Sequence, residues 1–298
     1  GMLSYADSRE THDAFMKLDF MAVTDLFMTP TAAMADIVFP AAGQFEINDI
    51  GHYGIGHGCI LARPKIVDPP AGCWPDMKIM NELGKRISPR ALWHEDFEEF
   101  LEDVVRPAGL DYGRFVEKGY LKGPERFKHY EKKGFRTPTG KVELKLSTAE
   151  KLNLKPLPEF PGFPEKDDAG YPLILISSKS PYYLHSSYRW IEKLRKLQPL
   201  PLAEIHPETA ERHGIRDGDE VVIETKQGRI SQVARLTDSI DRRVVNASHG
   251  WWFPEGSPED QYDWRSSNFN MLTSTKILGK EYGTPNLKAI PCRIGRKS

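Results

Sequence analysis

The chain has 298 residues, 39% of them hydrophobic and 28% charged, which is long enough for two ordinary globular domains with a sizeable core. Its 41 Lys and Arg against 42 Asp and Glu give a formal net charge of −1, which excludes the basic footprint of a nucleic-acid-binding protein. No run approaches the roughly 18 consecutive apolar residues of a membrane span, so we expect no membrane insertion.

The cysteines and the N-terminus give no sign of a redox centre or of export. Cys59, Cys73 and Cys292 stand at scattered spacings without a CxxC pair. Such spacings provide neither a disulfide framework nor the ligands of an iron–sulfur cluster. The first residues lack the charged and apolar regions of a signal peptide, and Gly1 before Met2 resembles the remnant of an expression tag.

The first half of the chain alternates helical and strand-like segments. Residues 7–18 begin with two candidate capping residues, Asp7 and Ser8, and carry apolar side chains on one face, which predicts a short helix. The apolar runs 20–24 and 37–39 predict two buried strands, and Pro75 opens a helical pattern that continues to Ile87. Short buried strands between helices indicate a parallel α/β sheet, so we expect a Rossmann-like layer here.

The following segment is rich in charge and ends in a linker. Residues 93–133 are compatible with helices and are predicted to form a surface elaboration. Residues 142–146 alternate apolar and charged side chains, which predicts a half-buried strand, and residues 147–150 have the Ser-x-x-Glu pattern of a capping box. Four prolines between residues 153 and 170 are typical of a linker, and we place the domain boundary after residue 165.

Beyond the boundary the predicted strands are short and the turns between them are tight. Helices are expected at residues 189–197 and from Pro207 to Gly214. Strands are predicted for four apolar runs: 173–176, 220–224, 229–234 and 290–294. Many short strands with glycine turns and only two helices indicate a small mixed β-barrel.

One glycine-rich segment, Gly51–Cys59, contains two histidines and a cysteine within eight residues. All three are possible zinc ligands, but a zinc site needs a convergent turn and a fourth ligand. The four glycines favour a loop that lies close to another backbone. Residues 134–141 resemble a phosphate-binding loop, but five residues separate the glycines instead of four. We therefore predict no metal ligand and no self-contained catalytic site.

Two later segments carry binding chemistry. Residues 177–189 follow a predicted strand and combine hydroxyl groups with a Lys, a His and an Arg, a donor-rich surface suited to a phosphorylated or polyheterocyclic ligand. The same hydroxyl groups also suit a loop that caps the following helix. Residues 249–254 contain three consecutive aromatic side chains, which serve either as core or as flanks of a planar ring.

At this point the pattern is specific enough to name a family. The chain resembles the C-terminal portion of the catalytic subunit of molybdopterin oxidoreductases of the dimethyl sulfoxide reductase family, and the match spans nearly its whole length. The resemblance rests on eight motifs in the family's order: 23–32, 35–41 with Glu46, 75–76, 135–144, 185–186, 206–219, 270–273, and 283–285 with Lys288.

The resemblance implies an architecture and a cofactor. Residues 1–165 would form a partial Rossmann-like α/β domain with a helical elaboration and the proline-rich linker, and residues 166–298 a double-psi β-barrel that binds molybdopterin dinucleotide. The complete enzyme would hold molybdenum or tungsten on two molybdopterin guanine dinucleotides. Its iron–sulfur cluster and its metal-ligating residue would lie on an N-terminal part or partner subunit that precedes Met2. Any export signal would lie there too, which leaves the bacterial or archaeal cytoplasm and the periplasm both open.

The family's motifs also imply cofactor contacts. The carboxylate of Asp25 would accept hydrogen bonds from the adjacent N–H donors of guanine, and Asp76 would contact guanosine. Lys179 stands where relatives often have Arg, which would weaken bidentate phosphate binding. The predicted contacts are Thr24, Asp25, Thr29, Asp76, Ser177, Ser178, Lys179, His185, Ser186, Trp252, Asn270 and Lys288.

Three functions follow as hypotheses. The first is the cofactor-binding part of a molybdenum or tungsten oxidoreductase, inactive without its N-terminal part. The second is a stand-alone pterin-nucleotide carrier or cofactor-assembly module, and the third is a purely structural barrel, because a fold does not fix a function. The reaction type is left open, since the family includes both reductases and acetylene hydratase.

Overall fold

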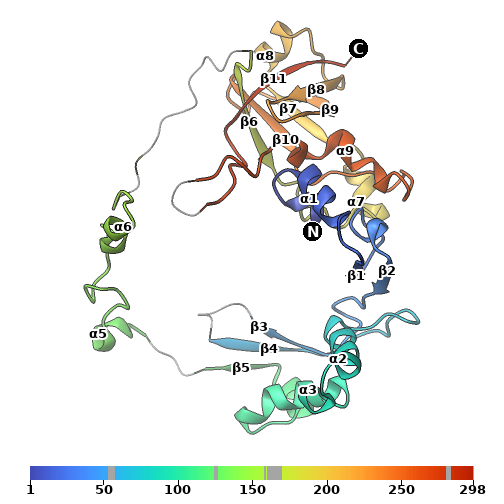
Figure 1. The fold of residues 1–298 in the computed structure, drawn as a ribbon, viewed down its shortest axis with the longest axis vertical. Helices are drawn as coiled ribbons and strands as arrows, with labels where there is room; N and C mark the ends of the chain where they lie inside the picture. Colours follow the sequence, from blue (N-terminus) through green and yellow to red (C-terminus); the bar gives the residue numbers. More distant parts are fainter. Residues whose placement is uncertain (53–57, 124–126, 158, 160–169, 280–282, 298) are drawn as a thin grey trace. The chain divides into compact units, whose positions relative to one another are not determined.

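The computed structural model describes residues 1–52, 58–123, 127–157, 159, 170–279 and 283–297. These residues form two compact units, which are coloured along the chain in Figure 1. The barrel unit contains Gly1–Met21, Met28–Asp36 and the chain from Glu159 onward. The sheet unit contains Ala22–Phe27 and Ile37–Pro158.

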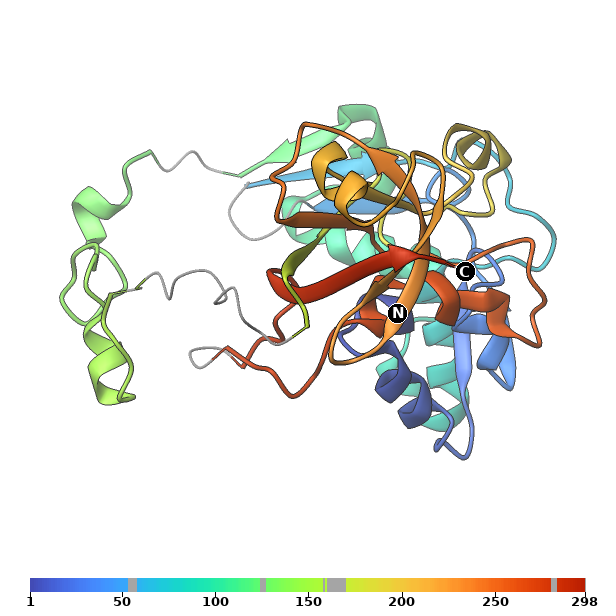
Figure 2. The ribbon, with the colours of Figure 1, turned by 90° about the horizontal axis from the view of Figure 1, so that it is seen from above.

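Six strands close into a barrel in the barrel unit (Figures 1 and 2). In order around the barrel they are β10 (Val244–Ser248), β6 (Leu173–Ser178), β11 (Ile290–Arg296), β8 (Glu220–Glu224), β9 (Arg229–Leu236) and β7 (Leu202–Ile205), which pairs again with β10. The pairs β6–β10 and β7–β9 are parallel, and the other four pairs are antiparallel. The predicted mixed β-barrel is therefore confirmed.

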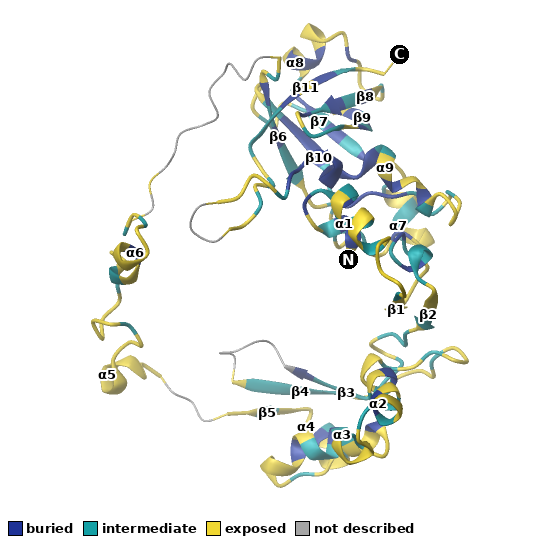
Figure 3. Ribbon diagram, in the orientation of Figure 1, coloured by how far each residue is buried: buried dark blue, intermediate teal, exposed yellow. Residues whose placement is uncertain are grey.

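The interior of the barrel is filled by the alternate side chains of its strands. Leu175, Ile205, Val221 and Val245 are fully buried, as the period of two along a strand requires. Figure 3 shows the barrel strands mainly as buried and intermediate residues. Closure leaves no free strand edge, so all of the barrel's backbone ladders are paired.

Short helices surround the barrel. Those in the barrel unit are η1 (Met2–Ser4), α1 (Ser8–Phe15), η2 (Ala32–Met34), α7 (Glu192–Leu197), α8 (Pro207–Arg212), η5 (Gln261–Asp263), α9 (Trp264–Ser267) and η6 (Phe269–Met271). Asp7 caps α1 as predicted, because its side chain accepts from the backbone N–H of Glu10 at 3.3 Å. Met2 and Leu3 belong to the hydrophobic core of the barrel unit, so the first residues of the chain pack with the barrel.

The sheet unit contains two small sheets. Strands β1 (Ala22–Asp25) and β2 (Ile37–Pro40) form a two-stranded parallel sheet where strands were predicted. Their predicted burial is wrong, because every residue of both strands is exposed or half-buried. Strands β3 (Asp49–His52), β4 (Cys59–Arg63) and β5 (Tyr120–Lys122) form an antiparallel sheet that the sequence did not indicate. The ends of the glycine-rich segment Gly51–Cys59 belong to β3 and β4, whereas residues 53–57 lie outside the described residues.

The helices of the sheet unit follow its strands. They are α2 (Asp76–Ile87), η3 (Arg90–Leu92), α3 (Phe97–Val105), η4 (Arg106–Ala108), α4 (Tyr112–Lys118), α5 (Tyr130–Lys133) and α6 (Ser147–Lys151). Pro75 precedes α2, as its sequence position predicts. None of the helices in the described part of the chain has the length and apolarity that crossing a membrane requires.

Three local predictions differ from the structure. Residues 142–146 form no strand, and most residues of the segment 127–157 are exposed rather than half-buried (Figure 3). Ser147 is the first residue of α6 rather than its cap, and both its N–H and its hydroxyl donate to the carboxylate of Glu143, at 3.3 and 2.9 Å. The predicted helix 189–197 is also shorter, because α7 begins only at Glu192.

The barrel interior should dominate the stability of its unit. Leu175 is 0% exposed, so L175A should lower the free energy of unfolding by about 2–5 kcal/mol through lost burial and the cavity that remains. The control L197A removes a leucine that is 56% exposed and should change stability by less than about 1 kcal/mol. Urea unfolding followed by near-ultraviolet circular dichroism measures both, and equal losses would contradict this packing.

Candidate functional site

Two loops meet at one end of the barrel because the strands that precede them are parallel. Strand β6 runs beside β10 in the register Leu175–Val245 and Ser178–Ser248. The loop after β6, residues 179–191, and the loop after β10, residues 249–255, therefore leave the barrel at the same end. We call them the β6 loop and the β10 loop.

Four predicted contact residues lie at or near the start of the β6 loop. Ser177 and Ser178 end strand β6, and the hydroxyl of Ser178 accepts from the side-chain amide of Asn246 at 2.8 Å. Lys179 follows and is exposed. Strand β11 begins opposite Leu175, so the exposed Lys288, two residues earlier, lies at this same end. The structure therefore brings these hydroxyl and ammonium groups together.

Side-chain contacts join the two loops. Nδ1 of His185 lies 3.2 Å from Nε2 of His249, and the indole N–H of Trp252 donates to the carbonyl of Ser186 at 2.7 Å. Gly250 lies so close that a Cβ there would be 2.7 Å from the carbonyl carbon of His185. Two predicted contact residues, His185 and Ser186, are thus held in place by the β10 loop.

The backbone of the β6 loop is strained. His185 and Tyr188 have φ angles of 51° and 72°, in the left-handed region that residues with a side chain seldom adopt. Each such residue costs on the order of 1 kcal/mol or more and persists only where its surroundings hold it. Such strain is concentrated at ligand-binding sites, so it is consistent with a functional loop.

Electrostatics at the loops favour an anionic ligand. Arg189 is 1% exposed, and its Nε and Nη1 groups find no hydrogen-bond acceptor among the described residues. The buried indole Nε1 of Trp251 is likewise without an acceptor. Burial lowers the pKa of Arg189 to about 9, so the guanidinium remains charged at neutral pH. This buried positive charge favours an anion bound near the two loops, although the enclosed donors themselves do not reach the surface.

His249 is kept neutral in the same place. Burial is the main cause that lowers its pKa to about 4, and the neighbouring His185, Arg189 and Lys179 lower it further. A neutral imidazole can accept or donate across the contact with His185, whereas two protonated rings would repel each other.

Two predicted contacts are enclosed by protein. Trp252 is 1% exposed and packs against Trp190 and Tyr262 in addition to holding Ser186. Asn270 is fully buried, and its side-chain amide donates to the carbonyl of Leu3 at 2.9 Å. In this structure both residues therefore support the barrel unit from inside.

Three predicted contacts lie in the sheet unit. Thr24 and the half-buried Asp25 end strand β1, and the exposed Asp76 begins α2. The carbonyl of Asp25 accepts from the N–H of Ala41 at 3.1 Å, and the N–H of Trp74 donates to the carbonyl of Pro40, also at 3.1 Å. Asp25 and Trp74, which lies two residues before Asp76, are therefore both hydrogen-bonded to the end of β2.

Thr29 has a local role in the barrel unit. Its hydroxyl accepts from the backbone N–H of Ala32 at 3.3 Å and its carbonyl accepts from Ala33 at 2.9 Å, so it stabilises the start of η2. Such an interaction satisfies helical N–H groups that have no partner within the helix.

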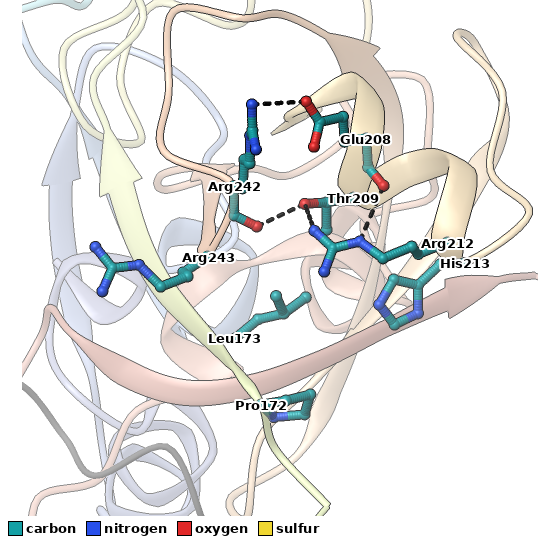
Figure 4. A pocket seen from close by; sticks show the side chains of 8 residues that line it. All are labelled: Pro172, Leu173, Glu208, Thr209, Arg212, His213, Arg242 and Arg243. Carbon is teal, nitrogen blue, oxygen red and sulfur yellow. Dashed lines mark hydrogen bonds and ion pairs between the residues drawn. The ribbon is translucent and has the colours of Figure 1, made fainter.

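A basic hollow of about 540 Å³ lies at the opposite end of β6 and β10 (Figure 4). Arg212 donates to the carbonyl of Glu208 and to the hydroxyl of Thr209, both at 3.1 Å. Arg242 pairs with the carboxylate of Glu208 at 2.7 Å, and Arg243 pairs with Asp241. The protein's own acceptors thus hold these guanidinium groups, unlike that of Arg189.

Comparisons with known proteins identify the chain. Residues 173–291 match the family model of the molydopterin dinucleotide binding domain, and residues 1–86 match that of molybdopterin oxidoreductase. The chain belongs to the molybdopterin oxidoreductase family. The matches cover five of the six barrel strands, the first two residues of β11, and both strands of the parallel sheet. Membership implies molybdopterin guanine dinucleotide carrying molybdenum or tungsten as the cofactor.

The relatives of this molybdopterin oxidoreductase chain are much longer proteins. The chain is 30% identical to acetylene hydratase of Syntrophotalea acetylenica over 96% of its own length and 41% of the relative's. It is 29% identical to the probable oxidoreductase YyaE of Bacillus subtilis over 90% of this chain and 41% of that one. The chain thus spans about two fifths of the length of these curated relatives.

A solved structure confirms the fold. Acetylene hydratase from Pelobacter acetylenicus aligns with a TM-score of 0.90 at 28% identity, over 98% of this chain and 42% of that one. The trimethylamine-N-oxide reductase of Haemophilus influenzae is 30% identical over 84% of this chain and 34% of its own length. The family therefore contains both a hydratase and a reductase.

The sequence did not indicate that three residues of this site lie together. Arg189 lies about sixty positions before His249 and Trp251 in the chain, and the three come together because β6 and β10 are neighbours. The residue types gave a partial signal, since the segments 177–189 and 249–254, which the sequence singled out, contain them. No metal-binding group of three His, Cys, Asp or Glu side chains occurs among the residues that the structure describes.

Close contact between the loops makes Gly250 irreplaceable. The variant G250A combines a φ of +65° with a Cβ 2.7 Å from a backbone carbon, so we expect a loss of at least about 2 kcal/mol. In the control G295A, on β11, no atom lies within 4 Å of the new Cβ, so stability should change little. Thermal unfolding of both variants measures this, and similar midpoints would contradict the close approach.

The neutral state of His249 predicts a pH dependence. Its folded pKa of about 4 lies below the ordinary value of 6.5, so between these values the unfolded chain binds a proton that the folded chain does not. Stability should therefore fall as the pH decreases from about 7 to 4, by up to about 3 kcal/mol from this group. The free energy of unfolding of H249Q, measured at several pH values, should depend less on pH than that of the original chain. The same pH dependence in both would contradict a lowered pKa of His249.

Proposed function

We propose that this chain is the cofactor-binding C-terminal part of a molybdenum or tungsten oxidoreductase, and that it depends on an N-terminal polypeptide for catalysis. The observation that carries the proposal is the pair of loops at one end of the barrel, where buried positive charge has no carboxylate partner among the described residues. An anionic dinucleotide provides the negative charge that such a site requires.

The barrel unit would bind the pterin and phosphate groups. Ser177, Ser178, Lys179 and Lys288 offer hydroxyl and ammonium donors at the end of the barrel where the two loops emerge. His185 offers a ring held by His249. Trp252 and Asn270 would act from inside the unit, by keeping the loop and the first residues of the chain in place.

The sheet unit would bind guanosine. Asp25 is the last residue of β1 and so lies at the carboxyl end of a parallel strand, where nucleotides bind in open α/β sheets. Guanine presents two adjacent N–H donors, which suit a carboxylate acceptor. Asp76 lies near Asp25 because backbone hydrogen bonds join the end of β2 both to Asp25 and to Trp74, two residues before Asp76. Thr24 precedes Asp25 on β1 and would add a hydroxyl group. Thr29, in the barrel unit, would act by keeping the start of η2 in place.

When bound, the cofactor supplies a metal centre held by dithiolene sulfurs, the source of this family's chemistry. The residues of this chain bind and orient it. The phosphate-binding donors lie on loops that the barrel fixes at one end, which keeps the cost of ordering them low.

A further polypeptide would complete the fold. Two parallel strands do not form a stable sheet alone, because parallel sheets bury both faces. Helix α2 of the same unit exposes a stripe of four apolar side chains at helical spacing: Met77, Met80, Leu83 and Ile87, between 40% and 74% exposed. Relatives more than twice as long have the additional chain that such surfaces require.

We propose the finer topology on the same basis. The two parallel pairs, β6–β10 and β7–β9, are consistent with a double-psi arrangement of the six strands. The parallel pair β1–β2 with its helix α2 is consistent with a fragment of a Rossmann-like layer, with the domain boundary in the linker near residue 165.

Guanine binding provides a direct test. The variant D25N keeps the size of the side chain but replaces one acceptor oxygen by a donor, so we expect it to weaken binding of GDP to the chain at least about tenfold. The control D68N changes an aspartate that is 88% exposed in the same unit. Titration calorimetry measures both. Equal GDP affinities in D25N and the original chain would contradict the proposed guanine contact.

Dependence on an N-terminal part is tested by metal content. The chain produced alone should hold far less than one molybdenum or tungsten atom, whereas production together with the polypeptide encoded immediately upstream should load it. The double variant M80D/L83D should reduce the amount of the upstream polypeptide that co-purifies with the chain. The control L144D changes a leucine that is 84% exposed outside the stripe and should leave that amount unchanged. Full metal occupancy with redox activity in the isolated chain would refute the proposal, and tight dinucleotide binding without metal or partner would favour the carrier hypothesis.

A further inference from the structure

One buried cation is not explained by the family's motifs. The guanidinium carbon of Arg189 lies 4.5 Å from the ring centre of Tyr183 and 4.4 Å from that of Trp251. The two rings meet nearly perpendicular to each other, at 88°. Arg189 therefore fills the corner between them. We call these three residues the Arg189 clamp.

The clamp connects the two loops. Tyr183 and Arg189 belong to the β6 loop, whereas Trp251 belongs to the β10 loop. Nη2 of Arg189 also donates to the carbonyl of His249 at 3.2 Å. The hydroxyl of Tyr183 donates to the carbonyls of Leu194 and Gln198, at 3.2 and 2.7 Å, which anchors the ring on α7 and the residue after it.

The charge in the clamp has no counter-ion. No carboxylate of the described residues forms an ion pair with Arg189, although its neighbour Arg195 pairs with Glu255. Cation–π contacts with two rings offset part of the cost of burying the charge. Two guanidinium nitrogens, Nε and Nη1, nevertheless have no acceptor among the described residues, and a buried group of this kind calls for an explanation.

We propose that Arg189 is a positioning residue of the cofactor site. The clamp holds the β6 loop in its strained form against the β10 loop, and its uncompensated charge raises the affinity of both loops for the diphosphate of the dinucleotide. The effect on diphosphate affinity rests on the proposed function, whereas the holding of the two loops concerns the chain without ligand. Because the guanidinium is enclosed, it acts through the loop donors Lys179, His185 and Ser186 rather than by contact.

The clamp is tested first without ligand. R189M removes the charge and the planar group but keeps an apolar stem, whereas R189K keeps the charge. Hydrogen exchange followed by mass spectrometry should show at least about tenfold faster exchange in both loops of R189M, with the peptides of β8 and β9 unchanged. The control R265M removes an exposed arginine that lies 4.5 Å from the ring of Trp264, outside the loops. Unchanged exchange in R189M would overturn the clamp.

Binding measurements distinguish an effect of Arg189 on the cofactor site from a loss of stability alone. Calorimetry should show that GDP binds R189M about tenfold more weakly than it binds the original chain. The GDP affinity of R189K should stay within about threefold of the original. Binding of guanosine, which has no phosphate, should change little in either variant. Equal GDP affinity in R189M and the original chain would overturn the proposal. If the original chain bound no GDP, the proposed function would fail, while the exchange data would still decide whether the clamp holds the loops.

Discussion

The parallel pairing of β6 with β10 is the constraint on which the site depends. These strands are about seventy residues apart in sequence, yet their shared direction makes both following loops emerge at one end of the barrel. Every contact that joins the loops follows from this pairing: the two histidines, the indole bond to Ser186, the close approach of Gly250 and the Arg189 clamp. In an antiparallel pair the same loops would lie at opposite ends of the strands.

Much of the fold could be predicted from local patterns, and the site only in part. Apolar runs and glycine turns indicated β6, β8, β9 and β11, since each strand's signal is contained within a few residues. The same alternation at residues 142–146 failed, because alternation alone does not make a strand: this segment is mostly exposed, and a strand is stabilised by burial and by packing on its neighbours. The burial of Arg189 was beyond sequence reasoning, because its two aromatic partners come from different loops and a charged residue is ordinarily expected at the surface.

The two units show complementary kinds of incompleteness. The barrel closes on itself, but the buried charge of Arg189 at one end has no carboxylate partner among the residues that the structure describes. The sheet unit instead leaves a two-stranded parallel sheet and an apolar helix stripe exposed. Charge without a counter-ion is characteristic of a site for an anion, and exposed apolar surface is characteristic of a protein interface. A cofactor and a further polypeptide are different solutions to these two physical problems.

The burial of the chain's first residues has a practical consequence for dissecting the molecule. Met2 and Leu3 are 0% and 2% exposed within the barrel unit, and the carbonyl of Leu3 accepts from the side chain of Asn270. A barrel cut out at the proline-rich linker would lose these side chains from its core and leave the amide of Asn270 without an acceptor. The barrel unit is therefore discontinuous in sequence, and a fragment that is to contain its whole core needs residues 1–21 and 28–36 together with the C-terminal segment.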